Sequence, residues 1–285
     1  MVNIVRIPQT FYRRTASKNV VQWTIWLEED QGIYTIKTSH GQKGGKIIED
    51  AGVIIVDGKA GRTPMEQAVL EFDSKVNKHR DQGYTFNTDG INVNLAPVPM
   101  LAQPYEKHGH KIIFPAIAQP KLDGVRCTAK MESDGSVSLL SRKGKEFQLL
   151  DQIRKAVIST GLPETFILDG ELYSDQMDFQ RVVGLVRKKT YKNQTDIDDM
   201  AKVKLNVFDA MDMANPDMTF IQRWKKAKQY VDKDTTGTLT MVPCYRVDND
   251  SDINALLSKF LAAGDEGVMI RNIKSPYEQG KRSYN

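Results

Sequence analysis

The stretch QPKLDGVR, residues 119–126, places Lys121 beside an aspartate, a glycine and an arginine, directly after the apolar run IIFPAIA. A short apolar run that ends at turn-forming residues predicts a β-strand, so Lys121 stands at a strand end. There it neither caps a helix nor belongs to a solvated charged face. A chemical role for this lysine is the hypothesis that the remaining segments of the chain test.

Segments with the pattern of β-strands continue after this one, and helical segments lie between them. The strand-like segments are IIFPAIAQPK (112–121), VRCTAK (125–130), SVSLLS (136–141), TFILDGELYS (165–174), VKLNVFDAM (203–211) and EGVMIRN (266–272). Apolar stripes indicate two helices, one through Leu150, Ile153 and Val157 and another through Ile253, Leu256, Leu257, Phe260 and Leu261. Strands mixed with helices predict an α+β domain.

The first 90 residues predict a small β-sheet with one packed helix. VVQWTIWLEE (20–29) and GIYTIKTS (32–39) have the pattern of two strands joined by a hairpin-like turn. In the segment that follows, Thr63 can cap a helix, Pro64 suits its first position and Glu66 completes a capping box. The apolar face expected for this helix consists of Met65, Ala68, Val69, Phe72 and Val76.

A domain boundary is indicated within FNTDGINVNLAPVPM, residues 86–100. This segment contains turn formers, two prolines and no helical period, as a linker does. We therefore expect one domain at residues 1–90 and a second at residues 91–285, in a chain long enough for two domains of modest size.

The composition excludes several classes of protein. No apolar run of about 18 residues exists that would span a membrane, and the N-terminus lacks the apolar core of a secretory signal. Two cysteines give no disulfide framework, so we expect an intracellular protein of the cytoplasm, the nucleus or a virus-infected cell. The four histidines make no zinc-ligand spacing with these cysteines. The net charge of +4 supports nucleic-acid binding only weakly.

The Lys-x-Asp-Gly-x-Arg pattern is short, but it belongs to an ordered set of segments. In chain order these are PMLA (99–102), KLDGVR (121–126), SRKG (141–144), LDGELY (168–173), VFDAM (207–211) and EGVMIR (266–271). From about residue 96 to residue 285 this set resembles the ATP-dependent DNA ligases, which are covalent nucleotidyltransferases. The resemblance implies an adenylation (nucleotidyltransferase) domain of antiparallel sheets with helices. Its expected partners are ATP, Mg²⁺ and nicked duplex DNA, in repair or replication.

By this resemblance Lys121 is the nucleophile that attacks the α-phosphorus of ATP and carries AMP through a phosphoramidate bond. The residue type suits the task, because a neutral amine is a nucleophile. Gly124 allows close approach of the backbone to a nucleotide. Arg126 and Arg142 are implied contacts of ribose or phosphate oxygens, since a guanidinium presents a fixed fork of donors. A surface charge on a hairpin is the alternative for Arg142.

Phe208 and Gln119 are the implied contacts of the adenine. The apolar residues of VKLNV (203–207) alternate on one face of their strand, which places Phe208 on the opposite face. A core phenylalanine is the alternative for Phe208. Backbone groups of residues 118–120 would meet the adenine edge, and Gln119 supplies the nearest side chain.

Two carboxylates complete the implied site. Glu171 and Glu266 lie in apolar, strand-like contexts, where a charge without a partner is costly. Mg²⁺ suits them, because this hard cation takes oxygen ligands. The resemblance gives Glu171 a ribose or metal role and Glu266 a metal role. Asp169 lies on the same strand face as Glu171, but an Asp-Gly turn is the favoured interpretation of Asp169.

The N-terminal segment carries a resemblance of its own. Its aromatic-rich first strand, the glycine-rich SHGQKGG (39–45), the helix ending in EFDSKVNKH and the closing Gly-Tyr are similar to a WGR domain, a DNA-binding module of DNA-repair enzymes. The namesake Trp-Gly-Arg is absent, and Ser-His-Gly stands at that position. Phosphate contacts are expected from Lys43, Lys46 and Arg62. A generic β-plus-α appendage is the alternative.

The ligase family normally continues into a segment with two lysines and an OB-fold domain. The chain stops at Asn285, so we expect a truncated form, and a monomeric one. An RNA ligase or a GTP-using capping enzyme is the alternative enzyme, and a nick-binding protein with impaired catalysis is the alternative outside enzymes. LDGELY, VFDAM and EGVMIR are closer to the DNA ligase forms, and intact Lys121, Arg126, Glu171 and Glu266 argue against lost activity.

Overall fold

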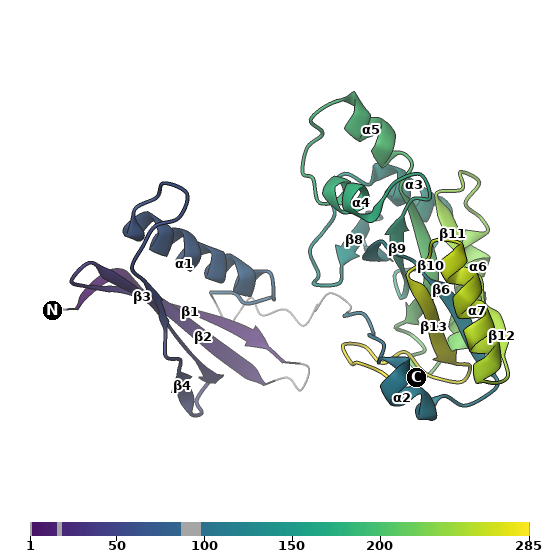
Figure 1. Cartoon of the computed structure of the whole chain (residues 1–285), viewed down its shortest axis with the longest axis horizontal. Helices are drawn as coiled ribbons and strands as arrows, with labels where there is room; N and C mark the ends of the chain where they lie inside the picture. The colour runs from purple at the N-terminus through teal and green to yellow at the C-terminus, as the bar shows by residue number, and fades with distance from the viewer. Residues whose placement is uncertain (1, 16–18, 87–97, 285) are drawn as a thin grey trace. The chain divides into compact units, whose positions relative to one another are not determined.

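The computed structural model describes residues 2–15, 19–86 and 98–284. The chain divides into two compact units, Met1–Leu95 and Ala96–Asn285 (Figure 1). Each unit contains hydrophobic core residues of its own. Most of the predicted linker at residues 86–100 lies outside the described residues.

The first unit contains an antiparallel sheet covered on one face by a helix. Its strands follow the order β1-β2-β3-β4, with β5 paired to β3. The described elements are β1 (Asn3–Arg14), β2 (Val20–Asp30), β3 (Ile33–Gln42), β4 (Ile47–Glu49), β5 (Val53–Ile55) and α1 (Pro64–Arg80). Sequence patterns predicted β2, β3 and α1 but missed β1, where two register shifts between Ile4 and Gln9 interrupt the alternation.

Helix α1 begins as the sequence predicts. Thr63 caps it, and the reciprocal hydrogen bonds with Glu66 form the capping box. Its buried face differs from the prediction, because Met65 is 50% exposed while Gln67 is buried. Gln67 is accommodated there because its amide oxygen accepts from Arg62 and its amide nitrogen donates to Glu71.

The second unit combines two sheets with several helices, so the α+β prediction is confirmed. Its first described elements are α2 (Tyr105–His108), a 3₁₀ turn (Gly109–Lys111), β6 (Ala116–Lys121), β7 (Val125–Met131), β8 (Val137–Ser141), α3 (Asp151–Ser159), β9 (Phe166–Tyr173) and α4 (Phe179–Val186). The remaining ones are α5 (Gln194–Met200), β10 (Lys204–Asp212), α6 (Phe220–Val231), β11 (Leu239–Met241), β12 (Tyr245–Val247), α7 (Asp250–Ala262) and β13 (Gly267–Asn272).

The larger sheet of this unit has the order β11-β10-β9-β7-β8, and the smaller sheet has the order β12-β6-β13. Strands β10 and β11 run parallel, while the other pairings in the described part of the unit are antiparallel. Helices α3, α4 and α6 contact the larger sheet, and α7 contacts the smaller one (Figure 1).

The main core determines which face of the larger sheet is free for chemistry. Leu168 and Leu172 of β9 and Leu205 and Val207 of β10 belong to this core and are fully buried. Because successive side chains of a strand point to opposite faces, the residues between them lie on the other face. Glu171 is one of these residues.

The two helices predicted from apolar stripes are present as α3 and α7. Within α7, Ile253 and Phe260 are buried, but Leu261 is 53% exposed, so its predicted place in the core was wrong. Residue 261 follows Phe260 by about 100° around the helix, which turns it past the edge of the packed stripe. Within the described ranges no helix has the length and apolarity needed to cross a membrane.

Candidate active site

Lys121 is the last residue of β6 and lies opposite Gly267 in the ladder with β13. The backbone N–H of Glu266 donates to the carbonyl oxygen of Lys121 over 2.8 Å, so both side chains leave the same end of the ladder. The Lys121 ammonium and the Glu266 carboxylate form an ion pair, with the side chains 40% and 49% exposed. The predicted nucleophile and one predicted metal ligand are thus in contact and accessible.

The turn that follows Lys121 passes very close to β9. A Cβ atom on Gly124 would lie 2.4 Å from the carbonyl oxygen of Leu172 and 2.8 Å from Cγ of Glu171. Glycine is needed here because any side chain would collide with that strand. This glycine seats the turn against Glu171 of β9, and the close backbone approach to a nucleotide stays a prediction.

A row of polar residues crosses the larger sheet beside this turn. Arg126 of β7 lies opposite Glu171 of β9, Glu171 lies opposite Asn206 of β10, and Asn206 lies opposite Thr240 of β11. The amide oxygen of Asn206 accepts a hydrogen bond of 2.6 Å from the Thr240 hydroxyl. The register alone therefore brings together two predicted site residues from segments 45 positions apart (126 and 171).

Glu171 is a carboxylate with little access to water. Burial raises its pKa to about 8; the Arg126 guanidinium opposes the rise, and Asp169 adds to it. The charges of Lys121 and Glu266 also act on this carboxyl group. Four charged residues predicted from the sequence motifs thus share one electrostatic environment.

Asp169 occupies a different place from the one predicted. It lies inside β9 rather than in a turn, and it is fully buried. Its carboxylate accepts two hydrogen bonds from Arg126, 2.5 Å from Nε and 2.6 Å from Nη2. A charged partner on the adjacent strand explains why an aspartate is tolerated in mid-strand. The same pair fixes the orientation of the Arg126 guanidinium.

Phe208 lies at an irregularity of β10, between the paired residues Val207 and Asp209. Its ring is partly exposed and has the Arg126 guanidinium 4.6 Å and the Arg271 guanidinium 5.5 Å from its centre. The backbone carbonyl of Phe208 accepts a hydrogen bond of 3.1 Å from Gln119 Nε2. The ring is therefore not enclosed in the hydrophobic core, and its contact with adenine stays a prediction.

The side chain of Gln119 is committed to the protein. It is 1% exposed, and its Oε1 accepts a hydrogen bond of 3.1 Å from Nε of Arg271. Arg271 in turn contacts Asp209, which is fully buried and also receives two hydrogen bonds from Arg223. Sequence reasoning missed this ion network, although a charged residue within each of two apolar strands, VFDAM and EGVMIR, was the available signal.

The other predicted contacts belong to elements that do not contribute to this cluster. Arg142 follows β8 in an exposed turn, one residue beyond the last pair of its ladder with β7. Lys43, Lys46 and Arg62 belong to the first unit. Lys46 is exposed, the Lys43 ammonium lies 5.3 Å from the centre of the Tyr12 ring, and Arg62 donates to Gln67.

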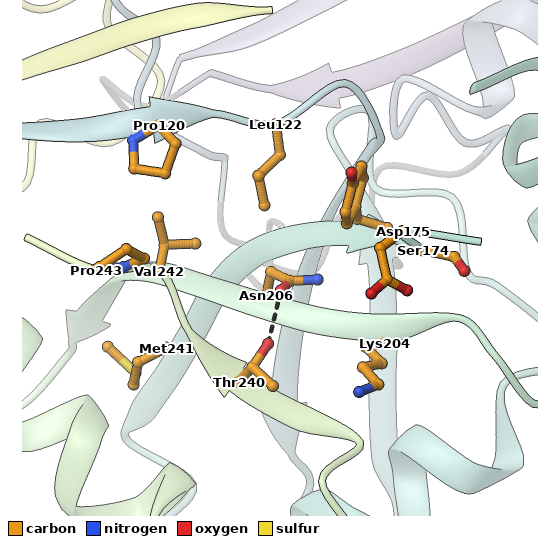
Figure 2. A pocket seen from close by; sticks show the side chains of 11 residues that line it. Pro120, Leu122, Ser174, Asp175, Lys204, Asn206, Thr240, Met241, Val242 and Pro243 are labelled. Carbon is orange, nitrogen blue, oxygen red and sulfur yellow. Dashed lines mark hydrogen bonds between the residues drawn. The ribbon is translucent and has the colours of Figure 1, made fainter. Parts of the chain in front are cut away.

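A hollow of about 240 Å³ is lined by Pro120 and Leu122, the two sequence neighbours of Lys121 (Figure 2). Asn206 and Thr240 form part of the lining with their hydrogen bond drawn in Figure 2, and Lys204 lies farther along the same strand. The hollow thus joins the strand of Lys121 to the polar row of the larger sheet.

The donor set is suited to a magnesium ion with few protein ligands. Among the described residues, no group of three or more His, Cys, Asp or Glu side chains is arranged to hold a metal. Glu171 and Glu266 nevertheless act on each other electrostatically, and two carboxylates suffice for Mg²⁺, which keeps waters and takes substrate phosphates as further ligands.

The two-sheet fold and its cluster of lysine, arginine and carboxylates have the form of a covalent nucleotidyltransferase. Comparison with known families matches residues 99–285 to the ATP dependent DNA ligase domain. The chain therefore belongs to the ATP-dependent DNA ligase family.

Curated relatives agree with this assignment. The DNA ligase of African swine fever virus (isolate Tick/South Africa/Pretoriuskop Pr4/1996) is 29% identical over 233 residues, covering 79% of this chain and 52% of the viral protein. The chain thus spans about half the length of that relative. The DNA ligase of phage T4 is 40% identical over 89 residues, 27% of this chain and 18% of the phage protein.

The fold is shared with solved DNA ligases. The bacteriophage T7 ATP-dependent DNA ligase in complex with ATP gives a TM-score of 0.55 at 18% identity, covering 67% of this chain and 68% of that one. The structure Pmar-Lig_PreS3 gives a TM-score of 0.58 at 23% identity, covering 79% of this chain and 50% of the other.

Proposed function

We propose that the complete protein is an ATP-dependent DNA ligase that seals a 5′-phosphate to a 3′-hydroxyl in nicked duplex DNA. The main support is the contact between Lys121 and Glu266 at the ladder end of β6 and β13, beside the pair of Arg126 and Glu171. These residues all lie in the stretch that matches the family.

The first step is attack of the Lys121 amine on the α-phosphorus of ATP. A phosphorus–nitrogen bond forms, the phosphorus–oxygen bond to pyrophosphate breaks, and the amine loses a proton. Glu266 is the carboxylate in contact with that amine. AMP then passes to the 5′-phosphate of the nick, and the 3′-hydroxyl displaces it.

Arg126 and Glu171 hold the nucleotide in this proposal. Asp169 already orients the Arg126 guanidinium through Nε and Nη2, so the N–H groups of Nη1 can donate to ribose or phosphate oxygens with little further loss of side-chain freedom. Phe208 offers its ring to the adenine, and Gln119 contributes through its backbone because its side chain is bonded to Phe208 and Arg271. Arg142 serves a phosphate group from its exposed turn.

In this proposal Glu171 and Glu266 would hold Mg²⁺. The bound cation would shield the charge of the triphosphate and of the departing pyrophosphate. The site's own residues supply the remaining functions. Lys121 presents the nucleophile, Arg126 orients the nucleotide, and the turn at Gly124 keeps the lysine beside Glu171.

The two domains divide the work in this proposal. Residues 91–285 are the adenylation domain, and residues 1–90 are a WGR-like domain that contacts DNA phosphates through Lys43, Lys46 and Arg62. The antiparallel sheet with one capped helix supports this, as does the exposure of Lys46. The enzyme works inside the cell as a monomer, in repair or replication.

Incubation with α-labelled nucleotides tests the proposal. The protein should form a covalent adduct with ATP and Mg²⁺ but not with GTP, and the purified adduct should transfer AMP to nicked duplex DNA. A GTP adduct would indicate capping chemistry, and transfer confined to nicked RNA would indicate an RNA ligase. Binding of nicks with no adduct under any condition would indicate a binding protein.

A further inference from the structure

Tyr277 lies next to the candidate site without belonging to any segment that the motifs single out. Its hydroxyl donates to Oδ2 of Asp169 over 2.5 Å and accepts from the backbone N–H of Met100 over 3.0 Å. Both hydrogen-bonding capacities of the phenol are therefore used in one geometry. The Arg223 guanidinium lies 5.5 Å from the centre of the Tyr277 ring.

These contacts close a ring of hydrogen bonds around Arg126. Arg126 donates to both carboxylate oxygens of Asp169, and its Nη2 also donates to the Met100 carbonyl oxygen over 3.2 Å. The Tyr277 hydroxyl donates to Oδ2 of Asp169, the oxygen that also accepts from Nη2 of Arg126, and it accepts from the backbone N–H of Met100. Because Asp169 is fully buried and Met100 is 6% exposed, water cannot readily replace the phenol in either bond.

This cycle of hydrogen bonds is held in place by two segments that are far apart in the sequence. Residues 98–101 lie beside residues 280–283, with hydrogen bonds from Leu101 N to the Lys281 carbonyl oxygen at 2.9 Å and from Ser283 N to the Leu101 carbonyl oxygen at 2.7 Å. The backbone N–H of Gly280 donates to the carbonyl oxygen of Val98 over 3.0 Å. Residues 98–101 and 280–283 together form a strap of paired backbone, and Tyr277 connects this strap to Arg126 through Asp169.

We propose that Tyr277 is a positioning residue, which fixes the direction of the Arg126 guanidinium toward the nucleotide by holding Asp169 and Met100 in place. This inference rests on the proposed contact between Arg126 and the nucleotide. Without the phenolic hydroxyl, Asp169 keeps Arg126 as a partner but loses its second anchor. The guanidinium then samples more orientations, and nucleotide binding must restore the order.

The test is a double-mutant cycle with Tyr277→Phe and Arg126→Ala, which measures the affinity of the full chain for AMP at equilibrium. AMP alone, without Mg²⁺, is the probe, so the measurement needs no catalysis. Tyr277→Phe should weaken binding roughly tenfold, as loss of one hydrogen bond to a charged group does. In the Arg126→Ala background the same substitution should change the affinity less than about twofold, because the hydroxyl acts through the arginine.

A matched control separates positioning from general stability. Tyr105 also donates its hydroxyl to an aspartate, Asp250, in a part of the unit outside the site. Tyr105→Phe should leave AMP affinity unchanged even where it lowers the melting temperature. The Nε–H NMR signal of Arg126, identified by its loss in Arg126→Ala, should move or broaden in Tyr277→Phe and not in Tyr105→Phe.

The outcomes distinguish the inference from the proposed function. Unchanged AMP affinity in Arg126→Ala would show that Arg126 does not contact the nucleotide, which would contradict this part of the proposed function. Weakened binding in Arg126→Ala with wild-type affinity in Tyr277→Phe would overturn the positioning role alone. An equal effect of Tyr277→Phe in both backgrounds would do the same, since it would show action independent of Arg126.

Discussion

At the scale of single residues, Lys121 owes its position to backbone pairing rather than to its own side chain. Its carbonyl oxygen accepts from Glu266 and its residue pairs with Gly267, so truncation of the side chain leaves the ladder intact. Lys121→Ala should therefore lower covalent AMP labelling by at least about a thousandfold, because the alanine side chain contains no nucleophile. The free energy of unfolding should change little. Labelling and thermal unfolding of this variant, beside Lys155→Ala on the exposed side of α3, measure both effects. Undiminished labelling would assign the nucleophile elsewhere.

Glu171 should give the protein a pH dependence of stability that its glutamine variant lacks. Burial raises its pKa from 4.5 to about 8, so between these values the folded state holds a proton that the unfolded chain has released. The unfolded state then binds fewer protons, and the free energy of unfolding must fall as pH rises. The stabilisation is complete below about pH 4.5 and lost as pH passes through about 8. Denaturant unfolding from pH 5 to 9 should show a steeper decline in the wild type than in Glu171→Gln. Parallel curves for the two proteins would show that Glu171 is already ionised in the folded protein over this pH range, which would contradict the prediction.

At the scale of elements, sequence reasoning located the strands that carry the candidate site, and it missed most of the contacts that join them. Alternation and turn residues identify β6, β7, β9, β10 and β13, because these patterns are local. The pairing of Arg126 with Asp169 is not local, since the register of β7 against β9 decides it, so Asp169 was misassigned to a turn. The resemblance to the ligase family implied one site for Lys121, Arg126, Glu171 and Glu266, without giving the contacts among them. No sequence pattern indicated Tyr277, because it lies in irregular backbone, where neither strand alternation nor helical spacing applies.

The pairing of β9 with β10 depends on a glycine in mid-strand. A Cβ atom on Gly170 would lie 2.6 Å from the carbonyl oxygen of Asn206 and 3.0 Å from Cδ1 of Leu205. Gly170→Ala must push these strands apart and should cost about 1–3 kcal/mol of unfolding free energy. It should also weaken AMP binding, because Glu171 follows directly.

Gly184 is the matched control for that substitution. It lies within α4, and a Cβ atom there would meet nothing within 4 Å. Gly184→Ala should raise the unfolding free energy by about 0.5–1 kcal/mol, as removal of a helical glycine does. Chemical denaturation of both variants measures the contrast. Equal stabilities would show that β9 and β10 have room to spare at Gly170.

At the scale of the whole molecule, the candidate site belongs to one of the two units, and the other unit has a core of its own. The core of the first unit is built around Phe11, Trp23 and Phe72, and it is complete without residues of the second. Lys121, Arg126, Glu171 and Glu266 all belong to the second unit. Chemistry and the proposed DNA contact of residues 1–90 are therefore separable in principle, and the nucleotide site should not depend on the first sheet.

The proposed DNA contact of the first unit should appear as a dependence on salt. Replacing Lys43, Lys46 and Arg62 together by alanine should weaken binding of nicked duplex and reduce the slope of log affinity against log salt by about 2–3, near 0.9 for each lost phosphate contact. Covalent AMP labelling should stay unchanged, since these residues lie outside the unit that contains Lys121. Replacement of Lys155, Lys225 and Lys259, on helices α3, α6 and α7 of the second unit, removes the same charge and provides the control. Binding isotherms at several salt concentrations give both slopes. Equal slopes in the two triple variants would show that the first unit does not hold DNA through these side chains, and its sheet would then need another partner.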